Sequence, residues 1–415
     1  MMNPFEEKPK SIKNYPMDWK TLYAAPYDKN TVDPHTKCRI ILMNGIEVES
    51  VMFQHNFHRN CGDNDLRRDL AEVRRNEQEQ QKQVNWLSPG DETQLETTIG
   101  YEHVAVDLTA WLAQHEPDAY VKQCMDFALL EDFDHLYRYA NLLKMDMNIP
   151  AHKLVRDYVE ITPGRPTIAH HRHPFDTVRK HCNAKKAALQ TLLNTLIITA
   201  GEQQTMNFYM NIGPTYPKEL GRQLYQEIAM VEEQHVTQYG ALLDTGRTWL
   251  ENLVLRDYME SYLYYSFSTD EPNRHIRKIW EIFFEQEVAH LHKAVEALKK
   301  YEKKEWQQVI PGTGEYPELL HFKTQKEYVR EVLASQIELT ADRETFVDIH
   351  DLPAGHEFFD WQKKVNGKTR NVPSHEVVEE YIGKNGRDYR SEEAENPVPA
   401  LQDRKADNTE IGRIR

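Results

Sequence analysis

Apolar residues recur every three or four positions through the middle of the chain, a spacing typical of α-helices that bury one face. Prolines and glycines interrupt this pattern and divide it into six long segments. The predicted helices cover about 91–115, 118–145, 176–210, 218–243, 247–267 and 272–304. The second and third are joined by a long, proline-rich connection at 147–174.

The flanking regions show other patterns. Two apolar runs surround Asn44-Gly45 within 38–53, the signal of a β-hairpin with a type I′ turn. A charged helix is predicted at 63–86, with the acids and arginines of 63–82 on a solvated face. One more helix is predicted at 323–342. Beyond about 350 the chain is polar, and we expect a loosely packed or disordered tail.

Together these elements predict an all-α fold. Its centre is a four-helix bundle with a long crossover, extended by a further helical hairpin, a small N-terminal β-hairpin and a polar C-terminal tail. The predicted divisions are an N-terminal extension at 1–90, the bundle with its extra hairpin at 91–305, and a C-terminal helix and tail at 306–415.

Amino-acid composition and charge exclude some classes of function. The net charge of −15 argues against sequence-independent nucleic-acid binding, which needs a basic face. The four cysteines form no CxxC pair, so neither a zinc ribbon nor an iron–sulfur site is indicated. No signal-peptide pattern or long apolar run is present, and we expect a cytoplasmic protein that does not bind membranes.

Acidic residues stand three positions before a histidine at four places, which puts both side chains on one face of a helix. The pairs are Asp132/His135, Glu232/His235, Glu287/His290 and Glu318/His321. With 66 acids and 19 histidines, about three such pairs arise by chance. The bare motif therefore indicates little.

The surroundings of three pairs add weight, because a further acid precedes each by 30 positions. Glu102 lies 30 positions before Asp132, and Glu202 lies 30 before Glu232. Asp257 lies 30 before Glu287, and Glu260 follows Asp257 by one turn. At 1.5 Å per residue, an antiparallel hairpin of 91–115 and 118–145 brings its two carboxylates to nearly the same height. The fourth pair has Val288 at that position and fails the test.

These acids share helix faces with apolar residues, so we expect them to point into the core. Glu102 lies on a stripe with Ile99 and Val106, and Glu232 on one with Ile228. Buried carboxylates that face one another repel unless they are protonated or bind cations. Carboxylates combined with imidazole suit iron or manganese.

This pattern resembles the ligand scheme of the ferritin-like di-iron and di-manganese carboxylate proteins, in which two helices each supply a carboxylate and two supply Glu-x-x-His. Rubrerythrins, ribonucleotide reductase small subunits and multicomponent monooxygenases belong to this group. The matching residues, within about 91–245, are Glu102, Asp132, His135, Glu202, Glu232 and His235. The resemblance implies a ferritin-like bundle that holds two iron or manganese ions, or one of each.

Two departures leave alternatives open. Asp132 stands where the family usually has Glu, and Glu131 could bind instead, together with His135 at i, i+4. The chain also has a surplus hairpin at 247–304. Its residues form a second or alternative metal set, Asp257, Glu260, Glu287 and His290.

Chain length favours the first two hairpins as the metal site. In the ferritin-like arrangement the chain must return along the bundle between hairpins, which takes about 35 residues at helical and extended rises. His135 and Glu202 are 67 positions apart, whereas His235 and Asp257 are only 22 apart. The extra hairpin is therefore expected to pack with a satisfied buried acid–His pair.

Three further features concern the same region. The loop sequence HHRH at 170–173 is expected to be solvated. Tyr139 and Tyr239 each follow a site histidine by one turn and are expected to be core aromatics. They are also candidates for hydrogen-bond partners of the site or for redox-active tyrosines.

The resemblance implies an oxidoreductase acting with O₂ or peroxide, such as an oxygenase or peroxidase, on a small-molecule substrate. Without CxxC pairs for a rubredoxin-type carrier, electrons would come from a separate donor. The alternatives are an iron storage or sequestration protein and a metal-free helical interaction protein. A homodimer is compatible with each of these.

Overall fold

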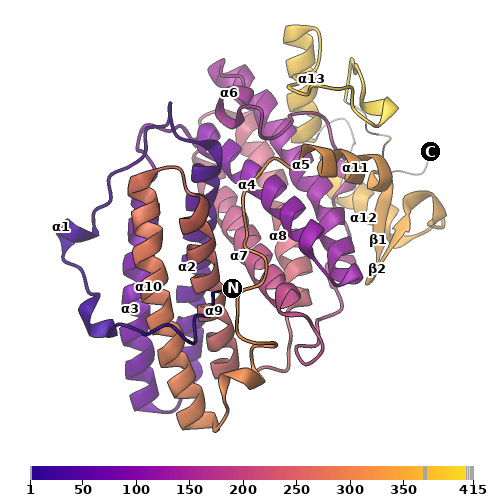
Figure 1. Ribbon diagram of the computed structural model, residues 1–415. Helices are drawn as coiled ribbons and strands as arrows, with labels where there is room; N and C mark the ends of the chain where they lie inside the picture. Colours follow the sequence, from indigo (N-terminus) through magenta and orange to yellow (C-terminus); the bar gives the residue numbers. More distant parts are fainter. Residues whose placement is uncertain (1, 368–371, 408, 410, 412–415) are drawn as a thin grey trace. The chain divides into compact units, whose positions relative to one another are not determined.

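A computed structural model describes residues 2–367, 372–407, 409 and 411. In this part the chain is mostly helical, with one small sheet (Figure 1). The elements are α1 (Trp19–Leu22), α2 (Pro34–Asn60), α3 (Asn64–Trp86), α4 (Gln94–His115), α5 (Ala119–Met147), α6 (His152–Val155), α7 (Leu189–Ile212), α8 (Glu219–Leu242), α9 (Trp249–Asp270), α10 (Arg274–Ala297), α11 (Lys326–Gln336), β1 (Leu339–Asp342), β2 (Thr345–Asp348), α12 (Glu357–Asn366) and α13 (Pro373–Asn385). The predicted all-α class is confirmed.

The chain divides into two compact units. The first unit contains Met1–Asp91, Cys182–Gly201 and Leu243–Phe322. The second contains Glu92–His181, Glu202–Leu242 and Lys323–Arg415. The segment 91–305, predicted as one bundle with an extra hairpin, is therefore shared between both units.

In the first unit α2, α3, α9 and α10 form a four-helix arrangement (Figure 1). The hairpins α2–α3 and α9–α10 pack against each other through α2 with α9 and α3 with α10. Each helix begins at a capping residue that satisfies free backbone N–H groups. Asp33, Asp63 and Asn273 cap α2, α3 and α10, and Thr248 forms a capping box with Glu251 at the start of α9.

The predicted N-terminal β-hairpin is wrong, because residues 38–53 lie inside α2. Asp33 caps this helix and Pro34 follows at its first turn, a start signal that outweighs the turn preference of Asn44-Gly45. Most of the apolar residues of 38–46 are buried. Short apolar runs buried on several sides do not distinguish a strand from a helix.

The second unit is built around the hairpin α4–α5. α8 packs on α5, and α11 and α13 cover α5 further out. The predicted helices at 91–115, 118–145 and 218–243 agree with α4, α5 and α8 within a few residues. α7 begins 13 residues later than predicted, at Leu189. Its last part, from Glu202, belongs to this unit.

The C-terminal region is folded where the structure describes it, contrary to the predicted tail. β1 and β2 pair antiparallel, with Leu339 opposite Asp348, so the predicted helix 323–342 ends early. Arg138 of α5 donates to Asp407 at 2.8 Å, and both side chains are fully buried. Amino-acid composition does not predict an ion pair between residues that are so far apart in the sequence.

None of the helices in the described part of the chain combines the length and the apolar character needed to cross a bilayer.

Candidate metal centre

The structure brings the six predicted residues of the second unit together. Glu102 comes from α4, Asp132 and His135 from α5, Glu202 from α7, and Glu232 and His235 from α8. All are at most 2% exposed. We call this set the second-unit centre.

One half of the second-unit centre surrounds the Nδ1 atom of His235. This nitrogen lies 3.1 Å from Asp132 Oδ1, 3.3 Å from Glu232 Oε2 and 3.8 Å from Glu202 Oε2. One ligand atom from each of the four residues falls within 4.8 Å of all the others. Four donors at this mutual distance can converge on a single cation.

The other half consists of Glu102, His135 and Glu232, whose ligand atoms also lie within 4.8 Å of one another. His135 Nδ1 is 2.9 Å from Glu232 Oε1. Glu232 therefore belongs to both halves, one carboxylate oxygen facing each histidine. A carboxylate in this position can bridge two cations.

Several oxygens of the centre lack a hydrogen-bond partner within the described chain, although they are buried. These are both oxygens of Asp132 and of Glu202, Oε2 of Glu102 and Oε2 of Glu232. A buried polar atom without a partner is costly, and a buried carboxylate more so. The donor set therefore fits a group that accepts several carboxylate oxygens at once.

The carboxylates also perturb one another. Burial, followed by the charge of Glu232, raises the pKa of Glu102 well above its usual range. Burial and the charge of Asp132 do the same for Glu202, and burial raises the pKa of Asp132. Protons or cations must offset this charge.

The pKa of Glu232 is lowered and the pKa of His235 is raised. Burial alone would raise the pKa of Glu232, but His135 and then His235 outweigh it and lower this pKa to about 2. Burial alone would lower the pKa of His235, but Asp132 and the neighbouring glutamates raise it well above its usual range. Without a bound cation, His235 therefore carries a proton that a metal would have to displace.

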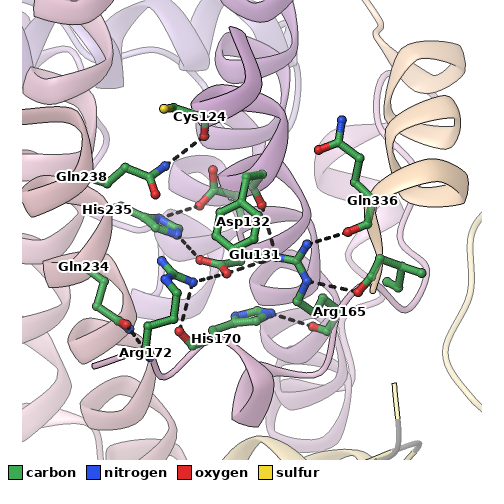
Figure 2. A network of polar contacts seen from close by, with 12 residues as sticks. Cys124, Glu131, Asp132, Arg165, His170, Arg172, Gln234, His235, Gln238 and Gln336 are labelled. Carbon is green, nitrogen blue, oxygen red and sulfur yellow. Dashed lines mark hydrogen bonds and ion pairs between the residues drawn. The ribbon is translucent and has the colours of Figure 1, made fainter. Parts of the chain in front are cut away.

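Glu131 contacts one ring nitrogen of His235 and Asp132 contacts the other (Figure 2). His235 Nε2 is 2.8 Å from Glu131 Oε2, while Arg165 and Arg172 donate to Glu131 Oε1 at 3.1 Å and 2.5 Å. Although burial opposes it, Arg172 and the adjacent histidines hold the pKa of Glu131 well below its usual range. Of the two acids, the geometry favours Asp132 as the ligand and Glu131 as the support of His235.

The HHRH loop supplies part of this support, so the expectation that it is solvated is wrong. His170 is fully buried and its Nε2 is 2.8 Å from the Arg165 carbonyl oxygen, and Arg172 is 2% exposed. His170, His171 and Arg172 are buried and His173 is half-buried, and Arg172 reaches Glu131, an interaction across 41 positions that no local pattern indicates.

Tyrosines line the other side of the second-unit centre. The hydroxyl groups of Tyr139 and Tyr239 are buried and have no hydrogen-bond partner among the described residues. Tyr209, which sequence reasoning missed, donates a hydrogen bond to Glu102 Oε1. Its ring lies 5.3 Å from that of Tyr139 and 5.6 Å from that of Tyr225.

The alternative set, Asp257, Glu260, Glu287 and His290, lies in the first unit and is fully buried there. It is joined by Glu47 of α2 and Glu77 of α3, which sequence reasoning missed. The expected solvated face at 63–82 is therefore wrong around Glu77, Glu79 and Gln80. The signal was available: Glu47 precedes Glu77 by the same 30 positions, with Gln80 where the other pairs have histidine.

Comparison with protein-family models, with curated proteins and with solved structures finds no match for this chain. Function must therefore be inferred from the geometry and chemistry of the residues themselves.

Proposed function

We propose that the second-unit centre binds two iron or manganese ions and that the protein is an oxidoreductase acting with O₂ or peroxide. The observation that supports this most is the pair of overlapping ligand groups that share Glu232. Two ligand groups that share a carboxylate can hold two cations close together, whereas a mononuclear site needs only one group. The resemblance to ferritin-like carboxylate proteins supports the same reading.

The charges also fit. Four ionised carboxylates (Glu102, Asp132, Glu202 and Glu232) balance two divalent cations, and the two imidazoles add neutral nitrogen donors. A donor set of oxygen and imidazole without thiolate suits iron and manganese. Such a pair of ions would supply two-electron redox chemistry toward O₂ or peroxide.

The protein's own residues would orient and isolate this centre. Glu131 accepts from His235 and fixes which ring nitrogen faces the carboxylates, while Arg165 and Arg172 balance the charge of Glu131. Tyr209 fixes the orientation of Glu102 through its hydrogen bond. Complete burial of these side chains keeps bulk water away.

A cavity of about 370 Å³ beside α8 would receive a small organic substrate. Arg172, Met230 and Trp361 are among the residues that line it. Arg172 also donates to Glu131, so a molecule bound here would contact a residue that supports His235. The reducing electrons would come from a separate protein or small-molecule donor.

The test is to load the metal-free protein with Fe²⁺ under anaerobic conditions and then add O₂. We expect O₂ uptake in proportion to the iron bound, and its loss in Glu232→Gln, which removes the shared ligand while preserving side-chain shape. Iron binding without O₂ uptake above that of free iron would contradict the oxidoreductase proposal. Continued iron uptake far beyond the ligand set would instead favour storage.

A further inference from the structure

We propose that the first unit holds a second centre for hard divalent cations such as Mn²⁺. It consists of Glu47, Glu77, Asp257, Glu260, Glu287 and His290, which we call the first-unit cluster. The proposal does not depend on the proposed function, because no residue is shared between the two sets.

The first-unit cluster is arranged in two overlapping groups, as in the second-unit centre. Glu77, Glu287 and His290 form one group and Glu47, Glu77 and Glu260 form the other, each with ligand atoms within 4.8 Å. Glu77 belongs to both. His290 Nδ1 lies 3.1 Å from Glu77 Oε1 and 3.3 Å from Glu287 Oε1.

Unpartnered buried atoms give an independent indication of a ligand. Asp257 and Glu260 are fully buried, and all four of their carboxylate oxygens lack a hydrogen-bond partner within the described residues. Glu47 and Glu77 each have one such oxygen. A buried acid whose oxygens accept hydrogen bonds needs no further partner. Six unpartnered oxygens among these acids instead require cations or protons to offset the cost of burial.

Except for Glu260, each residue of the first-unit cluster lies 55 positions from a counterpart in the second-unit centre, before it for the residues of α2 and α3 and after it for those of α9 and α10. The matched pairs are Glu47 with Glu102, Glu77 with Asp132, Gln80 with His135, Asp257 with Glu202, Glu287 with Glu232, and His290 with His235. The offset also matches Tyr264 with Tyr209, and each of these tyrosines donates to the matched glutamate, Glu47 or Glu102. A tyrosine outside the ligand set that repeats its contact argues that the spacing of the acids is repeated in both units, although the shared carboxylate is Glu77 in one set and Glu232 in the other.

The first-unit cluster has more oxygen donors and fewer imidazole nitrogens than the second-unit centre, so its donor atoms are harder Lewis bases. Its two groups contain four carboxylates and one imidazole, with Gln80 where the other set has His135, and the charges of Glu77 and Glu287 act on a fifth carboxylate, Asp257. Gln80 donates to Glu287 at 2.6 Å through its amide nitrogen. Oxygen-rich sets favour Mn²⁺ over the metals that prefer imidazole, such as zinc and copper.

The experiment uses the full chain, stripped with a chelator and reloaded with Mn²⁺ alone, with bound metal measured by elemental analysis. Glu232→Gln disables the second-unit centre and leaves the first unit intact. We expect this variant to retain about one to two Mn²⁺ ions per chain, given two overlapping groups with one shared ligand. Adding Glu77→Gln should remove them.

Two controls separate ligand loss from general disturbance. Glu79→Gln changes another buried acid of α3, which pairs with Arg75 at 2.8 Å, and should keep the Mn²⁺ content unchanged. Gln80→His supplies the imidazole that the offset predicts, and should tighten metal binding in the Glu232→Gln background by at least tenfold, the scale of a tuned ligand environment. This gain cannot result from misfolding.

The outcomes are distinct. Less than a tenth of an equivalent of Mn²⁺ in folded Glu232→Gln, with no gain from Gln80→His, would overturn the second centre and assign protons to the cluster. Loss of all metal in Glu77→Gln, with none lost in Glu232→Gln, would uphold the second centre while contradicting the proposed function.

Discussion

The two units contain buried carboxylate clusters of the same plan with different completeness. In the second-unit centre two helices supply acid-x-x-His, and Glu131 supports His235 from behind. In the first-unit cluster only α10 supplies a histidine, and Asn76 stands at the position matching Glu131. The spacing of the acids is therefore common to both, while the second histidine and the supporting carboxylate are the features on which the proposal of redox chemistry in the second unit rests.

The difference also shows how buried charge is managed. Arg165 and Arg172 enter the second unit from the connection before α7 and neutralise Glu131. In the first-unit cluster burial, with like charges adding to it, raises the pKa values of Glu47, Asp257 and Glu260 well above their usual range. The pKa values of Glu102, Asp132 and Glu202 are raised in the same way, so both sets depend on cations or protons for the charge balance of their converging carboxylates.

The largest expected effect comes from removing a carboxylate that has no hydrogen-bond partner in the described structure. Glu202→Ala should abolish metal loading of the second-unit centre, as measured by elemental analysis. Because the change also removes repulsion between buried acids, metal-free stability should hold or rise. The matched variant Asp257→Ala should leave loading of the second-unit centre intact. Normal metal content in Glu202→Ala would show that α7 contributes no ligand.

Glu131→Gln should have the next largest effect. It leaves Arg165 and Arg172 without their buried partner, a loss of about 3–5 kcal/mol in unfolding free energy. Weaker orientation of His235 should also lower metal affinity by about 10–100-fold. Denaturant unfolding and metal competition measure the two effects separately. Asn76→Ala is the control in the first unit, and an equal loss of metal affinity there would argue against a specific role for Glu131.

The tyrosine variants should act alike in both units. Tyr209→Phe and Tyr264→Phe each remove one hydrogen bond to a buried glutamate whose raised pKa favours the neutral acid, and such a bond contributes about 0.5–1.5 kcal/mol. Metal-free unfolding should show a decrease of this order for each. A large loss of unfolding free energy in one variant, with no loss in the other, would contradict the correspondence between the two sets.

The smallest effect concerns pH. Glu102, Asp132 and Glu202 have raised pKa values, and so does His235, so the folded metal-free protein binds more protons than the unfolded chain above about pH 5. Metal-free stability should therefore fall as the pH rises from about 5 to 8. Metal affinity should increase over the same range, because ligands must lose their protons. Calorimetric titration in two buffers measures the proton release, and binding without it would contradict these assignments.

The sequence was sufficient to predict that the residues of the second-unit centre come together, because their spacing follows local rules. Acid-x-x-His is a helical spacing, and 30 positions is the length of an antiparallel helical hairpin, so Glu102, Asp132 and their counterparts could be placed without any long-range information. The predicted helices at 91–115 and 118–145 succeeded for the same reason, since caps and apolar periodicity are local.

The failures have physical causes. Glu47 and Glu77 were missed because Asn44-Gly45 indicated a turn and the charged residues around Glu77 indicated a solvated face. Only packing of α2 and α3 against α9 and α10 shows that these acids are buried. Arg172 and Asp407 were likewise missed, because each pairs with a residue distant in the chain.

The most direct test of the dinuclear centre is metal stoichiometry in Glu77→Gln, which removes the shared ligand of the first-unit cluster. Protein expressed with iron and manganese supplied should contain about two of these ions per chain, and they should be spin-coupled by electron paramagnetic resonance, as expected for two metals bridged by Glu232. Less than half an equivalent of transition metal in this folded variant would contradict the centre.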